Sequence, residues 1–275
     1  MAAVGRDPAL PASSGLPWEN GGVPLTAIPA RSSRDLLLIL ATHPLGEADR
    51  IIVGLTAHHG MLRAVAKGVR RASSKMGARL EPFMVADVSF VSGRSLATIT
   101  QAVTVKAYSA PLVADWDAYV AASAICEVAD RIGQGEQDTA AALFPLTAGA
   151  LSALARHLHD PRDVLDSYLL RALAAAGWSV STNRCVRCGG EADLLGWSVR
   201  DGGAVGSGCL EPGDRPLRAG DLDRLDALAR GDWAALDSAD DDASRRRTGR
   251  LVRASVQWHL DHAFRSFDLL EERPR

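Results

Sequence analysis

Short apolar runs and alternating apolar and polar positions fill the chain between about residues 34 and 107. Apolar runs of strand length come first, and a strict alternation of apolar and polar residues follows, which is typical of strands with one buried face. The candidate strands are Leu36–Leu40, Ile51–Thr56, Met61–Val69, 86–90 and 97–106. The pattern predicts a small antiparallel barrel over residues 33–108, and the five-stranded OB-fold is the standard barrel of that size.

Turn signals separate these runs. His43-Pro44-Leu45-Gly46 predicts the turn between the first two strands, His58-His59-Gly60 predicts a hairpin, and residues 70–82 form a polar, basic loop. Arg63 and Lys67 are four residues apart on the third predicted strand, so we expect both side chains on the same face. Leu62, Ala64 and Ala66 take the other face, which suits the barrel interior.

The pattern changes to a helical period after Pro111. The candidate helices are Asp115–Ile132, Thr139–His157, Pro161–Ala175, Ala219–Arg230 and Ala243–Phe264. Glycines and three cysteines interrupt them at 183–212. The sequence therefore predicts an α+β protein: an OB-fold barrel at 33–108, then a helical domain at 109–275 with a small cysteine element inserted.

Composition limits the class of protein. In 275 residues, 47% are apolar and 23% charged, which excludes a largely disordered chain. Residues 1–32 are rich in Pro, Gly, Ala and Ser without a period, and they predict a disordered extension. We find neither an apolar run near the roughly 20 residues of a spanning helix nor a signal-peptide pattern, so we expect a cytoplasmic protein without membrane contact.

The net charge of −2 hides a strong segregation. Between Arg50 and Arg79 the chain carries seven cations and no acid, which is +7 against −9 in the remainder. The cations are Arg50, Arg63, Lys67, Arg70, Arg71, Lys75 and Arg79. An array of cations with adaptable backbone is suited to a phosphate backbone, whereas the alternative is a solvated charged hairpin. If about five of them each neutralise a phosphate, log affinity should fall with log salt at a slope near −4.

Nucleic acid is the anion that the residues favour. The chain has neither a Gly-x-x-x-x-Gly-Lys-Ser/Thr loop nor a Gly-x-Gly-x-x-Gly loop, so we expect no nucleotide cofactor. The basic segment holds no aromatic residue, and base stacking would need Phe83 or Phe90 from neighbouring strands. A second basic run, Arg245-Arg246-Arg247 with Arg250, follows Asp240–Asp242. We interpret it as a charge-balanced helix start, with an auxiliary DNA contact as the alternative.

The cysteines suggest a metal site. Cys185 and Cys188 form a Cys-x-x-Cys pair, whose two thiolates can share one tetrahedral zinc ion, and Cys209 is a third candidate ligand. Three cysteines do not complete the usual structural site, so either zinc binds or a metal-free element is held by packing. A fourth ligand could come from His157, His159, His259 or His262, on residue type alone. Cys126 lies on the apolar face of a predicted helix and is expected to be buried.

Three motifs together resemble those of a known family. Gly46-Glu47-Ala48-Asp49-Arg50 precedes Lys67-Gly68-Val69-Arg70-Arg71, and Gly77-Ala78-Arg79-Leu80-Glu81-Pro82-Phe83 follows. These residues resemble the RecO family of bacterial DNA repair and recombination proteins, densely over residues 35–107. The resemblance continues more loosely through Cys185–Cys188 to Gln257-Trp258-His259-Leu260.

The resemblance implies an OB-fold that binds single- and double-stranded DNA, followed by a helical domain. It implies a non-enzymatic mediator of the RecF pathway that anneals complementary strands. With RecR, such a protein helps load RecA onto strands coated by single-stranded DNA-binding protein. The resemblance also implies a cytoplasmic protein that is associated with the nucleoid. Many members carry a second Cys-x-x-Cys, whereas this chain reads Gly206-Ser207-Gly208-Cys209, so the knuckle is degenerate here.

Two other functions remain as alternatives. In one, the helical domain is an adaptor that docks protein partners, and DNA contact is secondary. In the other, the chain is a metal-dependent nuclease or hydrolase, but the sequence lacks an acidic metal cluster. We therefore expect a protein that is not an enzyme.

Overall fold

The computed structural model describes residues 32–93, 95–135, 137–239 and 241–270, without the side chains of 137 and 138. The predicted disordered extension, residues 1–32, lies outside this part of the chain except for its last residue. None of the described helices is long and apolar enough to cross a membrane.

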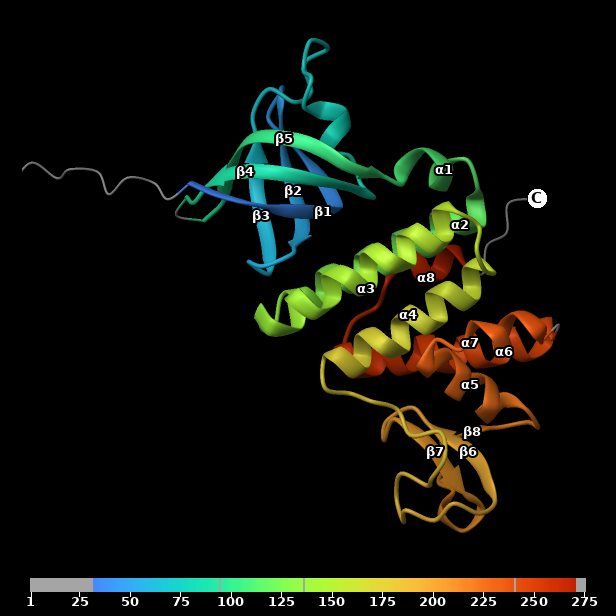
Figure 1. Ribbon diagram of the computed structural model, residues 1–275. Helices are drawn as coiled ribbons and strands as arrows, with labels where there is room; N and C mark the ends of the chain where they lie inside the picture. The colour runs from blue at the N-terminus through green and yellow to red at the C-terminus, as the bar shows by residue number, and fades with distance from the viewer. Residues whose placement is uncertain (1–31, 94, 136, 240, 271–275) are drawn as a thin grey trace, which may run out of the picture. The chain divides into compact units, whose positions relative to one another are not determined.

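A closed five-stranded barrel forms the N-terminal part (Figure 1). Its strands are β1 (Ser32–Leu45), β2 (Asp49–Thr56), β3 (Met61–Ala66), β4 (Met84–Val91) and β5 (Ala97–Ala107). They pair in the order β1-β2-β3-β5-β4, with β3 and β5 parallel and the other pairs antiparallel. This is the OB-fold barrel that the strand pattern predicts.

Strand β1 is apolar on both sides because both of its faces are buried. Leu37 and Ile39 pack inside the barrel, whereas Leu38 and Leu40 belong to the core of the helical domain. A continuous apolar run, rather than an alternating one, is what such a strand requires. The same run therefore closes the barrel and attaches it to the helices.

The predicted turn at 43–46 is wrong. β1 continues to Leu45, with Pro44 opposite Arg50, and the turn lies at 46–48. Gly46 adopts a φ of +57°, a left-handed conformation that favours glycine, and so ends the strand there. The proline does not end β1, since a strand tolerates a residue without an N–H where no hydrogen bond is needed.

The third predicted strand is shorter than expected. β3 ends at Ala66 because Gly68, with a φ of +67°, turns the chain. Lys67 therefore lies in the turn after the strand, and the expectation that it shares a strand face with Arg63 is wrong. The basic loop at 70–82 also contains a short 3-10 helix, Gly77–Leu80.

Helices follow the barrel. They are α1 (Ser109–Val113), α2 (Trp116–Gly133), α3 (Gln137–Ala155), α4 (Pro161–Ala175), α5 (Asp221–Arg230), α6 (Trp233–Ser238), α7 (Asp242–Leu260) and α8 (Arg265–Leu269). α4 has the predicted bounds, with Pro161 in its first turn and Asp160 as the cap. The last predicted helix ends at Leu260 because Asp261 is left-handed, and α8 follows as a separate helix.

The cysteine element contains a small sheet that the sequence pattern does not predict. Its strands are β6 (Leu194–Ser198), β7 (Gly203–Gly206) and β8 (Arg215–Pro216), in the order β7-β6-β8. Trp197 of β6 is fully buried in the helical core, and its Nε1 donates a hydrogen bond to Ser255 Oγ of α7 at 3.2 Å. This tryptophan therefore attaches the element to the helical domain by packing and a hydrogen bond.

Candidate nucleic-acid interface and cysteine cluster

The Lys67–Arg71 turn is fastened to the β1–β2 turn. The backbone N–H of Gly68 donates to Asp49 Oδ1 at 2.7 Å, and that of Arg70 donates to Ala48 O at 2.9 Å. The Arg70 guanidinium reaches Gly46 O at 2.9 Å. The Gly46–Arg50 motif and the Lys67–Arg71 motif are therefore in direct contact. Asp49 of the first motif accepts a hydrogen bond from the backbone of the second.

The rest of the basic segment is anchored by its few apolar side chains. Val69 and Leu80 are buried in the barrel core, and Met76 packs against them. A Cβ on Gly77 would lie 2.6 Å from Val69 O, so the two arms of the loop approach as closely as only glycine allows. The cations are thus presented on a packed loop.

The seven cations divide into two groups. Arg63, Lys67, Arg70, Arg71 and Lys75 are exposed, whereas Arg50 and Arg79 are half-buried. Within the described ranges, Lys67, Arg71 and Lys75 have no protein partner. These three side chains are the ones that an external anion can reach without displacing an existing contact.

The other four cations have contacts within the protein. Arg50 pairs with Glu81 at 2.5 Å, and Arg63 lies 3.5 Å from Asp130 of α2. Arg79 donates to Ala102 O at 2.9 Å. The segment itself contains no acid, but Glu81 and Asp130 from outside it reach Arg50 and Arg63.

The aromatic residues considered for base stacking are not available. Phe83 and Phe90 are each 5% exposed. Phe83 packs edge-on against Tyr119 at 6.0 Å, and Phe90 packs in the same way against His59 at 5.9 Å. This surface can therefore contact phosphates, but these two rings cannot stack on bases.

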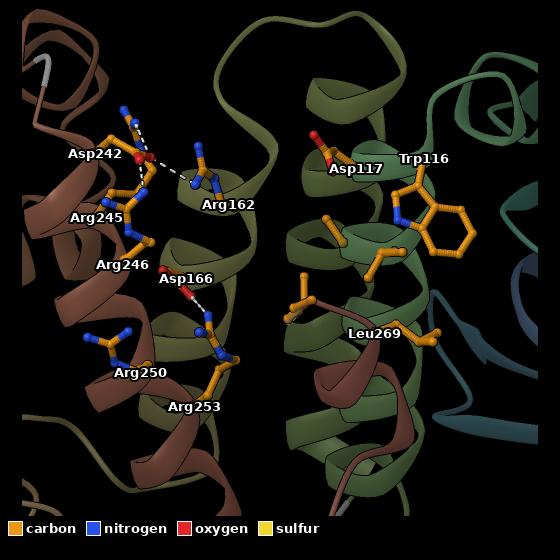
Figure 2. A pocket seen from close by; sticks show the side chains of 13 residues that line it. Trp116, Asp117, Arg162, Asp166, Asp242, Arg245, Arg246, Arg250, Arg253 and Leu269 are labelled. Atoms are coloured by element: carbon orange, nitrogen blue, oxygen red, sulfur yellow. Dashed lines mark hydrogen bonds and ion pairs between the residues drawn. The ribbon is translucent and has the colours of Figure 1, made fainter. Parts of the chain in front are cut away.

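A second basic surface lies in the helical domain, in a groove of about 670 Å³ (Figure 2). α7 and α4 supply its arginine-rich wall, and α2 and α8 supply a mainly apolar wall that also carries Asp117. The arginine-rich side is lined by Arg162, Asp166, Asp242, Arg245, Arg246, Arg250 and Arg253, and Trp116, Asp117, Val120, Ala121, Leu269 and Leu270 line the other side. The sequence signal for this groove is the run Arg245-Arg246-Arg247 with Arg250, whereas Arg162 and Arg253 lie outside that signal.

Most of these arginines are paired. Arg246 pairs with Asp242, one turn earlier on α7, and Asp242 also lies 2.9 Å from Arg162. Arg245 reaches Asp163 at 3.2 Å. These contacts agree with the interpretation of a charge-balanced helix start, and Arg250 is the arginine of this wall for which the described residues offer no partner.

A carboxyl group lies at the base of the groove. Burial raises the pKa of Asp166 to about 7, although Arg253 Nη1, 3.5 Å from Asp166 Oδ1, opposes this shift. A Cβ on Gly249 would lie 2.6 Å from Asp166 Oδ2, so α4 and α7 are close together at this point. At the groove floor, α4 and α7 therefore meet tightly around a buried carboxyl whose pKa burial raises.

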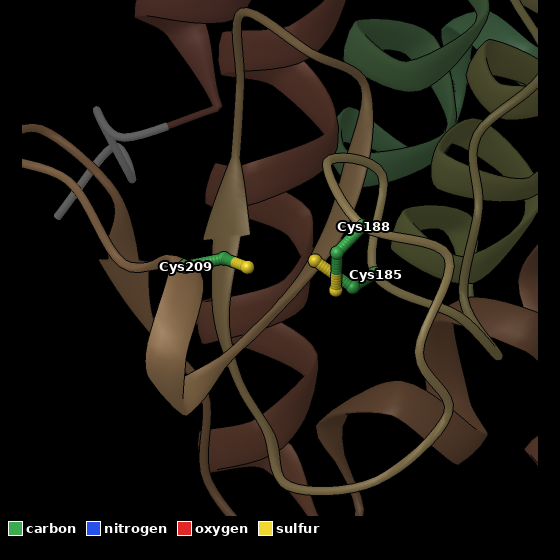
Figure 3. A group of neighbouring side chains, drawn as sticks. All are labelled: Cys185, Cys188 and Cys209. Atoms are coloured by element: carbon green, nitrogen blue, oxygen red, sulfur yellow. The ribbon is translucent and has the colours of Figure 1, made fainter.

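The structure brings Cys185, Cys188 and Cys209 together (Figure 3). Their Sγ atoms all lie within 4.8 Å of one another, and Cys188 is exposed. Backbone N–H groups, with Gly206 the strongest, lower the pKa of Cys185 to about 6. The Cys209 thiol interacts with Cys188 and Cys185, which raises its pKa to about 11. Three close thiols with one readily ionised member could hold a metal ion of the zinc class.

The four histidines considered as fourth ligands are not part of this cluster. Among the described residues, the group within ligand distance contains only the three cysteines. His159 instead pairs with Asp237 at 2.8 Å and stacks on Trp233, and His157 lies 3.5 Å from Asp115. His259 stacks on Trp178, and His262 packs against Phe264.

Cys126 is buried as expected, and burial raises its pKa.

Two family models match the chain, one over the barrel and one over the helical part. Residues 33–108 match the family model "Recombination protein O N terminal", and residues 113–268 match "Recombination protein O C terminal". The chain belongs to the RecO family of DNA repair proteins. A curated relative, "DNA repair protein RecO" of Bifidobacterium adolescentis, is 43% identical over 238 residues, which cover 85% of this chain and 97% of that protein. Membership in the RecO family supports a role in DNA repair and recombination for the barrel and helical domain described above.

Proposed function

We propose that this chain is a non-enzymatic recombination mediator that binds single- and double-stranded DNA through the basic segment of its barrel. One observation carries the proposal: Lys67, Arg71 and Lys75 are exposed without a protein partner in the described structure, on a loop that the barrel holds in place. Arg63 and Arg70 extend the same segment, each with one weak or backbone contact. Such an array neutralises phosphates in a row.

The contacts available favour recognition of the DNA backbone over its bases. The two neighbouring phenylalanines are buried, and cations bind any phosphate regardless of sequence. Two strands neutralised on one protein would repel each other less, and base pairing would then supply the free energy of annealing. In this mechanism the protein performs no chemistry and uses no nucleotide.

The partners follow from family membership and belong to the proposal. With RecR, the chain would help load RecA onto strands coated by single-stranded DNA-binding protein in the cytoplasm. The groove of the helical domain favours a second candidate function, that of a protein-docking adaptor. Arg250, for which the described residues offer no partner, and the apolar side chains of Trp116 and Leu269 fit an acidic segment that also carries apolar side chains.

We also propose that the cysteine cluster takes zinc. Cys185, Cys188 and Cys209 would hold the ion. Bound zinc would fix the Cys-x-x-Cys turn to the loop that carries Cys209, which is a structural contribution.

Annealing of complementary oligonucleotides tests the proposed function. We expect the purified chain to accelerate annealing of bare strands and of strands coated by single-stranded DNA-binding protein, without ATP. A duplex-specific fluorescence signal, recorded with and without protein, measures the rate. If the chain accelerates annealing of neither the bare nor the coated strands, the mediator function is contradicted. Annealing rates that depend on ATP would contradict its non-enzymatic character.

A further inference from the structure

The second half of the cysteine cluster has a glycine where the first half has a cysteine. Cys185 and Cys188 are three residues apart, and Gly206 stands three residues before Cys209. Structural zinc sites are closed by four protein ligands, whereas three protein ligands leave one position for a ligand from outside. The described part of the chain supplies three, since no histidine or carboxylate lies within ligand distance of the thiols.

Protein contacts link the two halves of the cysteine cluster. Arg187, between the two cysteines of the first half, donates from Nη1 to Cys209 O at 2.6 Å. The same guanidinium pairs with Asp214 at 2.7 Å and Asp201 at 2.8 Å. One side chain thus joins the Cys-x-x-Cys turn to the loop that carries Cys209.

A side chain at position 206 would have room for its Cβ next to this cluster. A Cβ on Gly206 would lie 3.7 Å from Ala192 O and 3.9 Å from Cys185 Cβ, which are ordinary contact distances. The φ of −71° and ψ of 155° at Gly206 suit any residue. The site therefore has three thiolates because position 206 lacks a side chain, and the backbone at this position would accept one.

We propose that the cluster binds a zinc-class divalent ion through Cys185, Cys188 and Cys209 and leaves its fourth position to an exchangeable donor from solution. The exposed Cys188 side is where such a donor has access, because Cys185 is buried. This inference rests on the proposal that the cluster takes zinc, and it is independent of the proposed DNA function. The donors that fit are water or a small thiol or imidazole, which zinc-class ions accept.

Cobalt(II) titration of the full chain under anaerobic, thiol-free reducing conditions tests this inference. We expect one cobalt ion per chain with a tetrahedral visible spectrum that shifts when imidazole is added. Gly206→Cys should give a spectrum with stronger thiolate charge-transfer bands that imidazole does not shift. Each ligand of a structural zinc site contributes strongly to the metal affinity. In a competition with a chelator, this variant should therefore show an affinity for cobalt about a hundredfold higher than that of the parent chain.

Gly206→Ser is the matched control, since it adds a side chain of similar size without a thiol. It should keep the imidazole-sensitive spectrum of the parent chain. A parent spectrum that imidazole leaves unchanged would overturn the open position, because it would mean that the protein closes the site itself. Absence of cobalt uptake by the parent chain would overturn both this inference and the zinc proposal, and would leave the annealing function untouched.

Discussion

Replacing Lys67, Arg71 and Lys75 together with glutamate should lower the DNA affinity of the chain by roughly 10²–10³-fold at about 0.1 M salt. Each phosphate contact contributes close to a tenfold factor at this salt concentration through counterion release, and the substitution removes three of them. The three residues are exposed and unpaired in the described structure, so reversal breaks no contact that holds the barrel. Fluorescence anisotropy with labelled single- and double-stranded oligonucleotides measures the loss.

The structure determines which cations to reverse. Arg70 and Arg71 are adjacent, but Arg70 bonds to Gly46 O, so its substitution would also disturb the turn between β1 and β2. Lys106→Glu is the control for a single reversal such as Lys67→Glu. Lys106 is exposed on β5 outside the basic segment, so its reversal should lower the DNA affinity far less than that of Lys67. Equal losses from Lys106→Glu and Lys67→Glu would show that net charge, not the segment, binds DNA.

The same triple variant separates the mediator from the adaptor. If the groove docks partner proteins, the triple variant should still bind RecR or single-stranded DNA-binding protein, because these residues lie on the barrel and the groove lies between α2, α4, α7 and α8. Annealing should fall together with DNA binding. Annealing that persists at the parent rate would favour the adaptor, with DNA contact secondary.

Trp197→Ala should lower the free energy of unfolding by about 3–5 kcal/mol. The side chain has no exposed surface and packs into the helical core from β6. Truncation leaves a large cavity and removes the hydrogen bond to Ser255, whose hydroxyl also donates to Leu251 O and so keeps one partner. Urea unfolding, followed by circular dichroism, measures the change.

Trp258→Ala is the control for this truncation. Trp258 lies on the neighbouring helix α7 but is 56% exposed, so its loss should change the stability by less than about 1 kcal/mol. Equal effects of the two substitutions would contradict the role of Trp197 in attaching the cysteine element. A large effect of Trp197→Ala in the presence of a chelator would show that this attachment does not depend on metal.

The barrel and the long helices could be predicted because each has a regular hydrophobic period. α4 begins with a proline in its first turn and ends before Gly177, so both of its ends are marked in the sequence. The strands of the cysteine element could not be found in this way. β7 has four residues and two of them are glycine, and β8 has two residues, which is too short for an alternation.

For the basic segment, the sequence predicts the charged surface but not the contacts of its individual cations. Its +7 identifies the surface, but the sequence does not show that Glu81 pairs with Arg50 or that Asp130, 67 residues away, approaches Arg63. The turn at 43–46 was misplaced for a similar reason. A proline usually interrupts a strand, and only the tertiary pairing of Pro44 with Arg50 shows that this one does not.

The salt dependence of DNA affinity tests the central claim most directly. Five cations of the basic segment are exposed: Arg63, Lys67, Arg70, Arg71 and Lys75. If each contacts one phosphate, a plot of log association constant against log sodium chloride concentration should have a slope near −4 for the parent chain. The triple glutamate variant should give a slope nearer −1 to −2, since about two contacts remain. A parent slope close to zero, or equal slopes for the two proteins, would contradict DNA binding through this segment.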